Sequence, residues 1–368
     1  MSGSTSKAPA ASPGRDQSFR AQVWRRFKKH RSGMGGLVMV VVLVFVALLA
    51  PLIANDRPIV AKYKEQWHFP AFTTYVDVWV PWQGMRFTLK SLEVGGSFPL
   101  SDHYAVLEGQ TWKEVELESA VWPIVKYHPN QFAPDEIKLS PGDDPSHRLG
   151  TDDLGRDVLS RMLHGTVVAM LVGLFSQSIA GTIGITLGLI AGYLGGWVDL
   201  VLSRITEVVM CFPTFFLIIA VIAFLPPSIM NIMIVLGLVG WTGIFRLIRG
   251  EVLRTRSLDF VAAAKSLAIP QRRIMFRHIL PNAISPVFVA LAFGVARAVL
   301  AETSLSFLGF GDPSVPSWGE IVQQGRNYVS QGLWHLTVYP GIAIFVTLTA
   351  FNLFGQGLRD ALDPKLRD

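Results

Sequence analysis

The chain has 368 residues, of which 50% are hydrophobic and only 16% are charged, a balance too apolar for an ordinary soluble protein. Its formal net charge of +6 could suit a nucleic-acid-binding protein, but the basic residues are segregated by segment, as membrane topology requires, and no nucleic-acid motif accompanies them. The single cysteine, Cys211, excludes an intramolecular disulfide and a cysteine-based metal cluster. We therefore expect an all-α polytopic membrane protein without a nucleic-acid partner.

Residues 1–34 form the predicted N-terminal tail. The tail begins rich in Ser, Ala and Pro and then becomes basic, through Arg20, Arg25, Arg26, Lys28, Lys29 and Arg31. Because Lys and Arg near a membrane-spanning segment resist translocation, we expect this end in the cytoplasm. The apolar run 35–54 is longer than the hydrophobic region of a usual secretory signal and is predicted to be an uncleaved first transmembrane helix.

Residues 55–165 form a long polar stretch in which acidic residues outnumber basic ones, and we expect it outside the membrane. Alternation in Tyr75–Val80 and Val115–Glu118 predicts short strands. Five tryptophans could form a small core or lie at the membrane interface: Trp67, Trp79, Trp82, Trp112 and Trp122. The stretch is predicted to be a compact, partly β insert that either meets a substrate-binding protein or acts as a stabilising cap.

The insert ends with HRLGTDDLGRDVLSRMLHG, residues 147–165. Its charged side chains can pair locally as a helix begins: Asp152, Asp153, Arg156, Asp157 and Arg161. A catalytic carboxylate pair is an alternative, but no nucleophile or metal-ligand cluster stands beside it. The segment resembles the GTDxxGRDVxSR signature of the peptide-type permeases of ABC importers. That resemblance implies a gating or structural role at the outer face of the transport pathway for Asp152, Arg156 and Asp157.

Residues 166–356 are predicted to form a five-helix core. Its first span is predicted at Val167–Tyr193. Glycines recur at every fourth position in its second half and just beyond it: Gly184, Gly188, Gly192 and Gly196. Small residues on one helix face allow close approach in lipid, so this face is expected to contact another helix, which a second permease chain could supply. The sequence GGWVD at 195–199 then predicts a short turn and matches the family's GGWxD sequence.

The next span, Leu200–Leu225, carries Arg204 and Glu207 near its inner end. Three residues apart, they can pair on one helical face, although Glu207 is also a candidate pathway residue. The Phe212-Pro213 step, which resembles the family's FP element, should kink or interrupt the helix. Another span follows from Ile229 to about Leu247.

The cytoplasmic loop 248–282 contains the most basic stretch of the core. Six Lys or Arg residues lie between Arg254 and Asn282 against one acid, Asp259, with Arg249 just upstream. Asp259 is the predicted N-cap of a short helix that Pro270 ends. Spacings of three and four give this helix a small apolar ridge of Phe260, Ala263, Ala264 and Leu267, which could enter a groove on another protein or lie on the chain's own membrane domain.

The segment DFVAAAKSLAIPQRRIMFRHILPN resembles the EAA loop of ABC importer permeases, whose coupling helix docks on the ATP-hydrolysing subunit. Matching positions are Asp259, Phe260, Val261, Ala263, Leu267, His278, Leu280, Pro281 and Asn282. The resemblance implies that coupling is carried by Asp259, Phe260, Val261, Ala263, Ala264, Leu267 and Ala268. Ala268 stands where the family usually has Gly. Because Ala resists φ > 0, the turn after the helix is expected to differ from the family's.

The fifth span is expected from Ala283 towards Leu305 and contains Arg297 and Glu302. Ionisable groups are costly in hydrocarbon, so both are candidates to face a polar pathway or a protein partner. Five positions apart, they do not share one helical stripe. Glu302 lies in AETSLSFLGFG, which is close to the family's EAALSFLG sequence, and Arg297 is expected either on the pathway or paired with another helix.

After an outer segment at 309–330, whose GDPSVPSWGE resembles the family's outer loop, the sixth span is predicted at Leu333–Phe354. The tail 357–368 contains GLRDALDP, which matches the family's GLRDxLDP sequence. Six spans place both termini in the cytoplasm, as the basic residues independently require.

These motifs identify the chain as resembling the C-type permease subunit of dipeptide and oligopeptide ABC importers. The stretch Leu52–Pro70 further resembles the oligopeptide and microcin C importer branch. The resemblance implies six transmembrane helices in the type I ABC importer permease fold, with the partly β insert between helices 1 and 2. It also implies a bacterial inner-membrane location, a second homologous permease, two ATP-binding subunits, an extracytoplasmic substrate-binding protein, and membrane lipid as surroundings.

No G-x-x-x-x-G-K-[ST] sequence occurs, so ATP and Mg²⁺ are expected in partner subunits, and this chain is expected to bind no cofactor or metal and to catalyse no covalent reaction. Two alternatives remain from other classes. An ion-driven secondary transporter would be expected to show inverted repeats. A membrane-bound enzyme would have to use the Asp-rich 152–157 segment.

Overall fold

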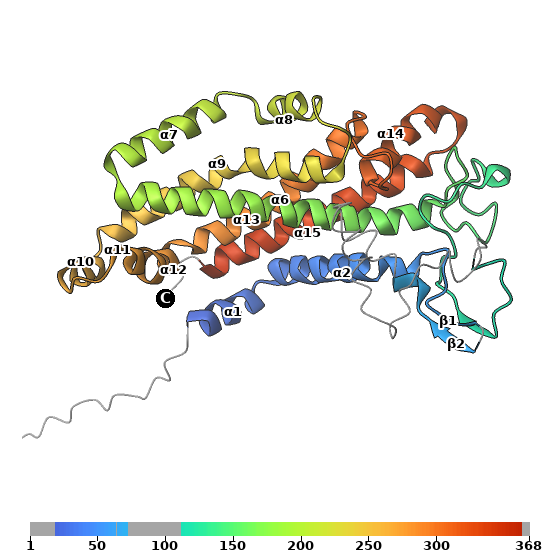
Figure 1. The fold of residues 1–368 in the computed structure, drawn as a ribbon, viewed down its shortest axis with the longest axis horizontal. Coiled ribbons are helices and arrows are strands. Elements are labelled where there is room, and N and C mark those ends of the chain that lie inside the picture. Colours follow the sequence, from blue (N-terminus) through green and yellow to red (C-terminus); the bar gives the residue numbers. More distant parts are fainter. Residues whose placement is uncertain (1–18, 64, 73–111, 363–368) are drawn as a thin grey trace, which may run out of the picture.

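The computed structural model describes residues 19–63, 65–72 and 112–362. They form an elongated helical bundle with a small sheet at one end (Figure 1). Five helices are long and apolar enough to cross a membrane, and a bent pair makes a sixth crossing when it is counted as one. The expectation of a helical protein with six spans and a partly β insert is therefore confirmed.

The spanning helices of the bundle are α2 (Arg31–Ile53), α6 (Val158–Leu194), the pair α7 (Gly196–Met210) and α8 (Thr214–Ile222), α9 (Ile229–Arg256), α13 (Ser285–Phe307) and α15 (His335–Leu362). Four of the spanning helices, α2, α6, α9 and α15, are longer than the apolar runs that predicted them. The predicted span begins at Val167, nine residues after the start of α6, because the apolar run begins only there, and the added turns contain Arg161 and His164. Both side chains are buried within the protein, so the helix continues past the apolar run.

The two ends of the bundle carry different elements. One end holds α1 (Phe19–Lys29), α10 (Asp259–Ser266), α11 (Gln271–Arg273), the π-helix η3 (Ile274–Ile279), α12 (Leu280–Ala283) and the end of α15 (Figure 1). The sheet and α14 (Trp318–Tyr328) lie at the opposite end. The predicted basic loop and the predicted insert are therefore separated by the length of the spans.

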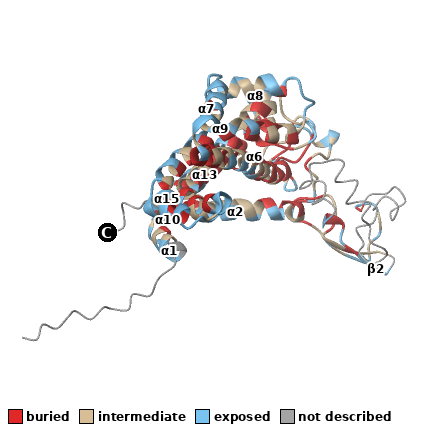
Figure 2. Cartoon of the chain, turned by 60° about the vertical axis from the view of Figure 1, so that its left-hand side comes forward, coloured by how far each residue is buried: buried red, intermediate tan, exposed pale blue. Residues whose placement is uncertain are grey.

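The predicted interruption at Phe212-Pro213 is present. Helix α7 ends at Met210, α8 begins at Thr214, and the two helix axes differ by 81°. Proline lacks the N–H that a continuous helix would need, so a break at this point follows from the local sequence. Figure 2 shows that buried residues gather on the inner helices, whereas α7 is largely exposed and buries only Thr206.

The glycine face of α6 packs against α9 of the same chain. A Cβ at Gly184, Gly188 or Gly192 would lie within 2.9 Å of α9 atoms, including the backbone oxygens at Trp241, Phe245 and Arg249. Gly196 has nothing within 4 Å. The predicted packing face is therefore real, but α9 occupies it rather than a second permease chain. The predicted GGWVD turn is limited to Gly195 and Gly196, since α7 begins at Gly196.

The insert contains a three-stranded antiparallel sheet in the order β2 (Gln66–His68), β1 (Val60–Tyr63), β3 (Ser119–Val121). The predicted strand Val115–Glu118 is wrong by a few residues, and the predicted strand Tyr75–Val80 lies outside the described residues. Trp112 is buried against Ala61, with Trp122 beside it, whereas Trp67 is 55% exposed. Trp79 and Trp82 also lie outside the described residues. Single turns of 3₁₀-helix, η1 (Pro70–Phe72), η2 (Pro134–Glu136) and η4 (Val329–Gln331), complete this end.

Candidate functional site

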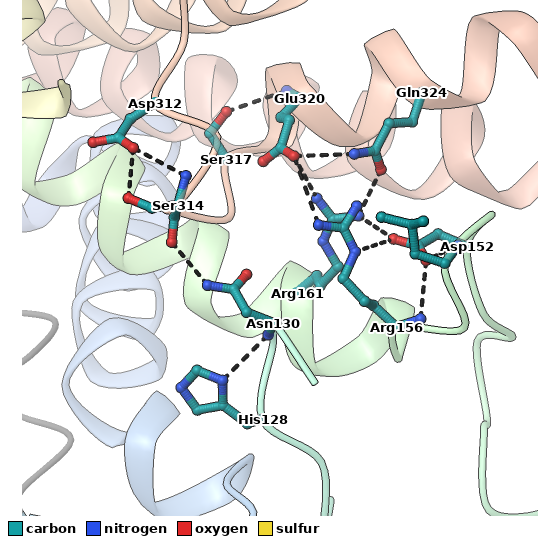
Figure 3. A network of polar contacts seen from close by, with 11 residues as sticks. His128, Asn130, Asp152, Arg156, Arg161, Asp312, Ser314, Ser317, Glu320 and Gln324 are labelled. Atoms are coloured by element: carbon teal, nitrogen blue, oxygen red, sulfur yellow. Dashed lines mark hydrogen bonds and ion pairs between the residues drawn. The ribbon is translucent and has the colours of Figure 1, made fainter. Parts of the chain in front are cut away.

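A buried ion network joins the start of α6 to α14, and it consists of Asp152, Arg156, Arg161, Glu320 and Gln324 (Figure 3). The Asp152 carboxylate accepts from Arg156 Nε at 2.7 Å and also from Arg161 Nη1. Arg161 lies 3.2 Å from the Glu320 carboxylate and donates to Gln324 Oε1 at 2.6 Å. The predicted local pairing is confirmed for Asp152 with Arg156 and Arg161. Nothing in the sequence pointed to the two partners on α14, Glu320 and Gln324.

Charge within this network is balanced, with two guanidinium groups and two carboxylates. Asp152 and Arg161 are wholly buried, and Arg156 is 5% exposed. Burial raises the pKa of the Glu320 carboxyl, and the adjacent guanidinium groups of Arg161 and Arg156 oppose that rise. A buried charge needs a partner, so each member holds the others in place. The network ties two elements of one chain together, which is a structural role in this conformation.

Asp157 takes part in a second buried pairing next to this network. Its carboxylate accepts from the Ser160 N–H at 2.7 Å, which caps α6, and lies 2.8 Å from His147 Nδ1. The other ring nitrogen, Nε2, is 2.9 Å from the Glu136 carboxylate. Both ring nitrogens can donate only in the protonated imidazole. Burial alone favours the neutral ring, but the two carboxylates outweigh it and hold the pKa of His147 above its ordinary value.

Raising the pH should weaken this pairing. Because the folded-state pKa of His147 is raised, its contribution to stability is complete below about pH 6.5 and is lost as the pH rises through the folded-state value. We expect the melting temperature of the wild-type chain to approach that of His147→Gln between about pH 6 and pH 9. A Glu136→Gln chain, which keeps only one carboxylate on the ring, should show a smaller pH dependence. A gap between wild type and His147→Gln that stays constant with pH would contradict the assignment.

The segment between α13 and α14 is tied to two other parts of the chain, α9 and the insert. Asp312 accepts from the Ile229 N–H at the start of α9 and from the Ser314 N–H. Asn130 of the insert donates to the Ser314 carbonyl oxygen at 2.8 Å (Figure 3). The sequence treats 309–330 as an outer loop and misses α14, whose N-cap Ser317 accepts from the Glu320 N–H.

At the opposite end, α10 corresponds to the predicted coupling helix. Asp259 is its first helical residue, and the prediction of Asp259 as N-cap is wrong because Leu258 takes that position without a side-chain cap. Asp259 still lies in the first turn, where its charge suits the helix dipole. Val261 is fully buried and Ala264 is 6% exposed, so both anchor α10 to the bundle.

The predicted apolar ridge of α10 is divided by this anchoring. Phe260 and Leu267 are 41% and 75% exposed, and Ala263 between them is exposed as well. Ala264, which the spacing places on the ridge, instead faces the chain's own core. The outward surface is therefore formed by Phe260, Ala263 and Leu267, which we name the α10 ridge.

The turn after α10 adopts the conformation that glycine would favour. Ala268 has φ of 51°, its N–H donates to the Lys265 carbonyl, and the Ile269 N–H donates to the Ala264 carbonyl. These two bonds form a Schellman motif, which requires a left-handed residue after the helix. The expectation that Ala268 changes the turn is wrong, because the hydrogen bonds and the buried Ala264 impose the turn in spite of the Cβ.

Replacing Ala268 by glycine should stabilise this turn. The left-handed conformation costs an alanine about 1–2 kcal/mol. Glycine avoids this cost but makes the unfolded chain more flexible, so Ala268→Gly should raise the free energy of unfolding by about 0.5–1 kcal/mol. The corresponding slowing of hydrogen exchange at the Ile269 amide is about two- to fivefold. Ala268→Val, which adds branching at the same position, should speed that exchange. An unchanged Ile269 amide in both variants would show that the turn carries no strain.

Two arginines of α9 join that helix to α6 and α7 near α10. Arg249 of α9 binds both carboxylate oxygens of Asp199 on α7, with Nη2 at 2.7 Å from Oδ2. Arg256 donates to the Tyr193 carbonyl oxygen at 2.8 Å at the end of α6. Arg249 and Arg256, which were predicted only as basic residues of the cytoplasmic loop, therefore hold α6, α7 and α9 together.

The remaining pathway candidates occupy different environments. Arg204 and Glu207 form the predicted pair at 2.6 Å, with side chains 71% and 59% exposed. Glu302 is 2% exposed and accepts from the Ser306 hydroxyl at 2.7 Å. Arg297 lies midway along α13, is exposed, and forms no hydrogen bond or ion pair with the residues that the structure describes. The structure does not bring Arg297 and Glu302 together.

The described part of the chain contains no group of three or more His, Cys, Asp or Glu side chains that could hold a metal ion. Asp152 and Asp157, on which the enzyme alternative depends, are engaged by Arg156, Arg161 and His147. The geometry thus defines a polytopic membrane protein whose insert end is held by buried ion pairs and whose opposite end carries the exposed helix α10.

The chain belongs to the family of binding-protein-dependent transport system inner membrane components, whose sequence model matches residues 184–368. Residues 18–68 match the N-terminal transmembrane domain of oligopeptide transport permease C. It is a multi-pass permease component of an ABC importer, in which ATP hydrolysis belongs to separate subunits. This membership favours the importer over the secondary-transporter and enzyme alternatives.

Curated relatives match over different lengths. The inner membrane ABC transporter permease protein YejE of Escherichia coli is 34% identical over 93% of this chain and 96% of its own length. The dipeptide transport system permease protein DppC of Alkalihalophilus pseudofirmus is 39% identical over 61% of this chain and 74% of its own. The glutathione transport system permease protein GsiD of Pectobacterium atrosepticum is 39% identical over 63% of this chain and 77% of its own.

Proposed function

We propose that this chain is one of two homologous permeases in a bacterial inner-membrane importer for peptides or related small solutes. Peptide substrates are supported by relatives named for dipeptide and glutathione transport. A substrate-binding protein would deliver the solute at the end that carries the insert. The narrower assignment to the oligopeptide and microcin C branch rests on the resemblance of Leu52–Pro70 to that branch. It is tested by measuring whether microcin C competes with peptide uptake by the importer.

The observation that carries the proposal is the α10 ridge. Val261 and Ala264 fix one side of α10 to the bundle, while Phe260, Ala263 and Leu267 face outward from the end remote from the insert. A short anchored helix with an apolar outward face suits a groove on another protein. The groove would belong to one of two ATP-binding subunits that hold ATP and Mg²⁺, with Asp259 and Ala268 at the two ends of the contact.

In the proposed orientation, α1, α10 and the end of α15 lie in the cytoplasm. The basic residues of α1 and of the 254–277 region agree with that orientation, because Lys and Arg are retained on the cytoplasmic side. ATP binding would then move α10 and, through its anchors Val261 and Ala264, the spans. A ligand shifts such an equilibrium only by its differential affinity for the two states.

Arg297 is proposed as a residue of the transport pathway. An exposed guanidinium midway along a span is costly in lipid, so it should face water, solute or the second permease. The buried candidates Asp152, Arg156, Asp157 and Glu302 would act as supports of the outer gate, and Glu207 as half of a surface pair. Wild-type uptake by an assembled Arg297→Met importer would contradict the pathway role.

Mass spectrometry of proteins that co-purify with the tagged chain in mild detergent, with and without ATP and vanadate, tests the proposal. Recovery of a second six-span permease and of ATPases with a P-loop is expected. Reproducible isolation of a stable chain without any ATPase would overturn the assignment of the α10 ridge.

A further inference from the structure

Helix α1 contributes no residue to the α10 ridge or to the proposed transport pathway. Its sequence FRAQVWRRFKK contains five basic residues and no acidic ones. His30 has extended backbone angles and separates α1 from the span α2. The chain therefore turns at His30, and α1 stays tethered to the membrane end of α2 by a single residue.

One side of α1 is fixed to the end of α15. Phe27 is 3% exposed and meets Phe354 edge-on, with ring centroids 5.9 Å apart. His30 Nε2 lies 2.8 Å from the Asp360 carboxylate, while its Nδ1 accepts from the Gly33 N–H. Just after α1, the close contact of Gly33 with Gly357 brings α2 and α15 together. The orientation of α1 around its own axis is therefore set by protein contacts.

The opposite side of α1 presents positive charge. Arg25, Lys28 and Lys29 are exposed and form no ion pair with the described residues. Trp24, 48% exposed, stacks on Phe27 with ring centroids 6.0 Å apart, so it lies at the edge of the basic side, where Lys28 Nζ is 5.2 Å from its ring centroid. Arg31, also exposed, begins the span whose outward side chains soon become apolar at Val38.

We propose that the face formed by Arg25, Lys28, Lys29 and Trp24 binds the anionic phospholipid headgroups of the surrounding membrane. A tryptophan among basic side chains at the mouth of a span suits the interface, where its ring sits at headgroup level. The direct tether to α2 holds these charges at that depth, which favours lipid over a protein partner. Through Phe27 and His30, bound lipid would steady the end of α15.

The test uses the full chain in mild detergent, with added phosphatidylglycerol or phosphatidylcholine, and counts retained lipids by native mass spectrometry. Each basic residue near an anionic surface contributes about fivefold in binding at low salt, so Arg25→Gln/Lys28→Gln/Lys29→Gln should lower phosphatidylglycerol retention at least tenfold. Retention by the wild type should fall with added salt. Phosphatidylcholine should be retained weakly by both chains.

The matched control is Arg272→Gln/Arg273→Gln/Arg277→Gln, which removes three exposed basic residues at the same end. It should leave phosphatidylglycerol retention nearly unchanged. Equal loss in both triple variants, no loss in the α1 variant, or equal retention of the two lipids would overturn the proposal. An α1 variant that keeps phosphatidylglycerol but no longer co-purifies with an ATPase would assign this face to a protein partner instead.

Discussion

Ala263→Glu should abolish uptake while the permease remains folded and abundant. Ala263 lies at the centre of the α10 ridge, and its side chain is exposed, so the substitution leaves the bundle intact. When α10 docks, the carboxylate of a glutamate at this position would lose its hydrating water and be buried in an apolar groove. Such an unpaired charge costs several kcal/mol, and about 3 kcal/mol already weakens coupling roughly 100-fold.

The measurement is uptake in proteoliposomes that contain the assembled importer, together with the ATPase rate in the presence of the binding protein. Ala262→Glu is the matched control, because Ala262 is also exposed but is rotated by about 100° around the helix from Ala263. It should retain most of the uptake. Normal uptake by Ala263→Glu at normal abundance would remove the ridge from the coupling mechanism.

Asp152→Asn should strongly destabilise the end of the bundle that carries the insert. Asp152 accepts from two guanidinium groups and from the N–H groups of Leu154 and Arg156, and it is fully buried. Neutralising it leaves Arg156 and Arg161 with one carboxylate, Glu320. Breaking a buried pair on one side typically costs about 3–5 kcal/mol, since a buried charge is left uncompensated.

Denaturant unfolding in mild detergent, followed by tryptophan fluorescence, measures this loss. Glu207→Gln is the control, because the Arg204–Glu207 pair is exposed and should contribute about 0–1 kcal/mol. Adding Arg161→Gln to Asp152→Asn restores charge balance and should recover part of the stability. If Asp152→Asn unfolds like the control, the network contributes little to holding α6 against α14.

Features that depend on a few neighbouring residues could be predicted before the structure was known. The break at Pro213, the Arg204–Glu207 pair and the glycine stripe of α6 follow from backbone chemistry and helical spacing. The spans follow from length and hydropathy, although their ends do not. Polar residues such as Arg161 and His164 extend a helix when protein, rather than lipid, surrounds them.

The candidate coupling surface was predicted only in part. Spacing alone places Ala263 and Ala264 on one ridge, because both lie within reach of Phe260 and Leu267 on a helical wheel. The packing of Val261 and Ala264 against the bundle turns the helix so that Ala263 faces outward and Ala264 inward. The conformational preference of alanine also gives the wrong prediction at Ala268, where two backbone hydrogen bonds impose a left-handed conformation.

The sequence by itself determined the membrane class, the number of crossings, the basic end of the bundle and the motifs of the permease family, because these depend on composition and short-range order. Tertiary structure decided which charges meet. Arg161 pairs with Glu320 of α14, which is far from it in the sequence, and α9 rather than another chain covers the α6 glycines. Such contacts depend on how whole helices pack in three dimensions, which the spacing of residues within one helix does not specify.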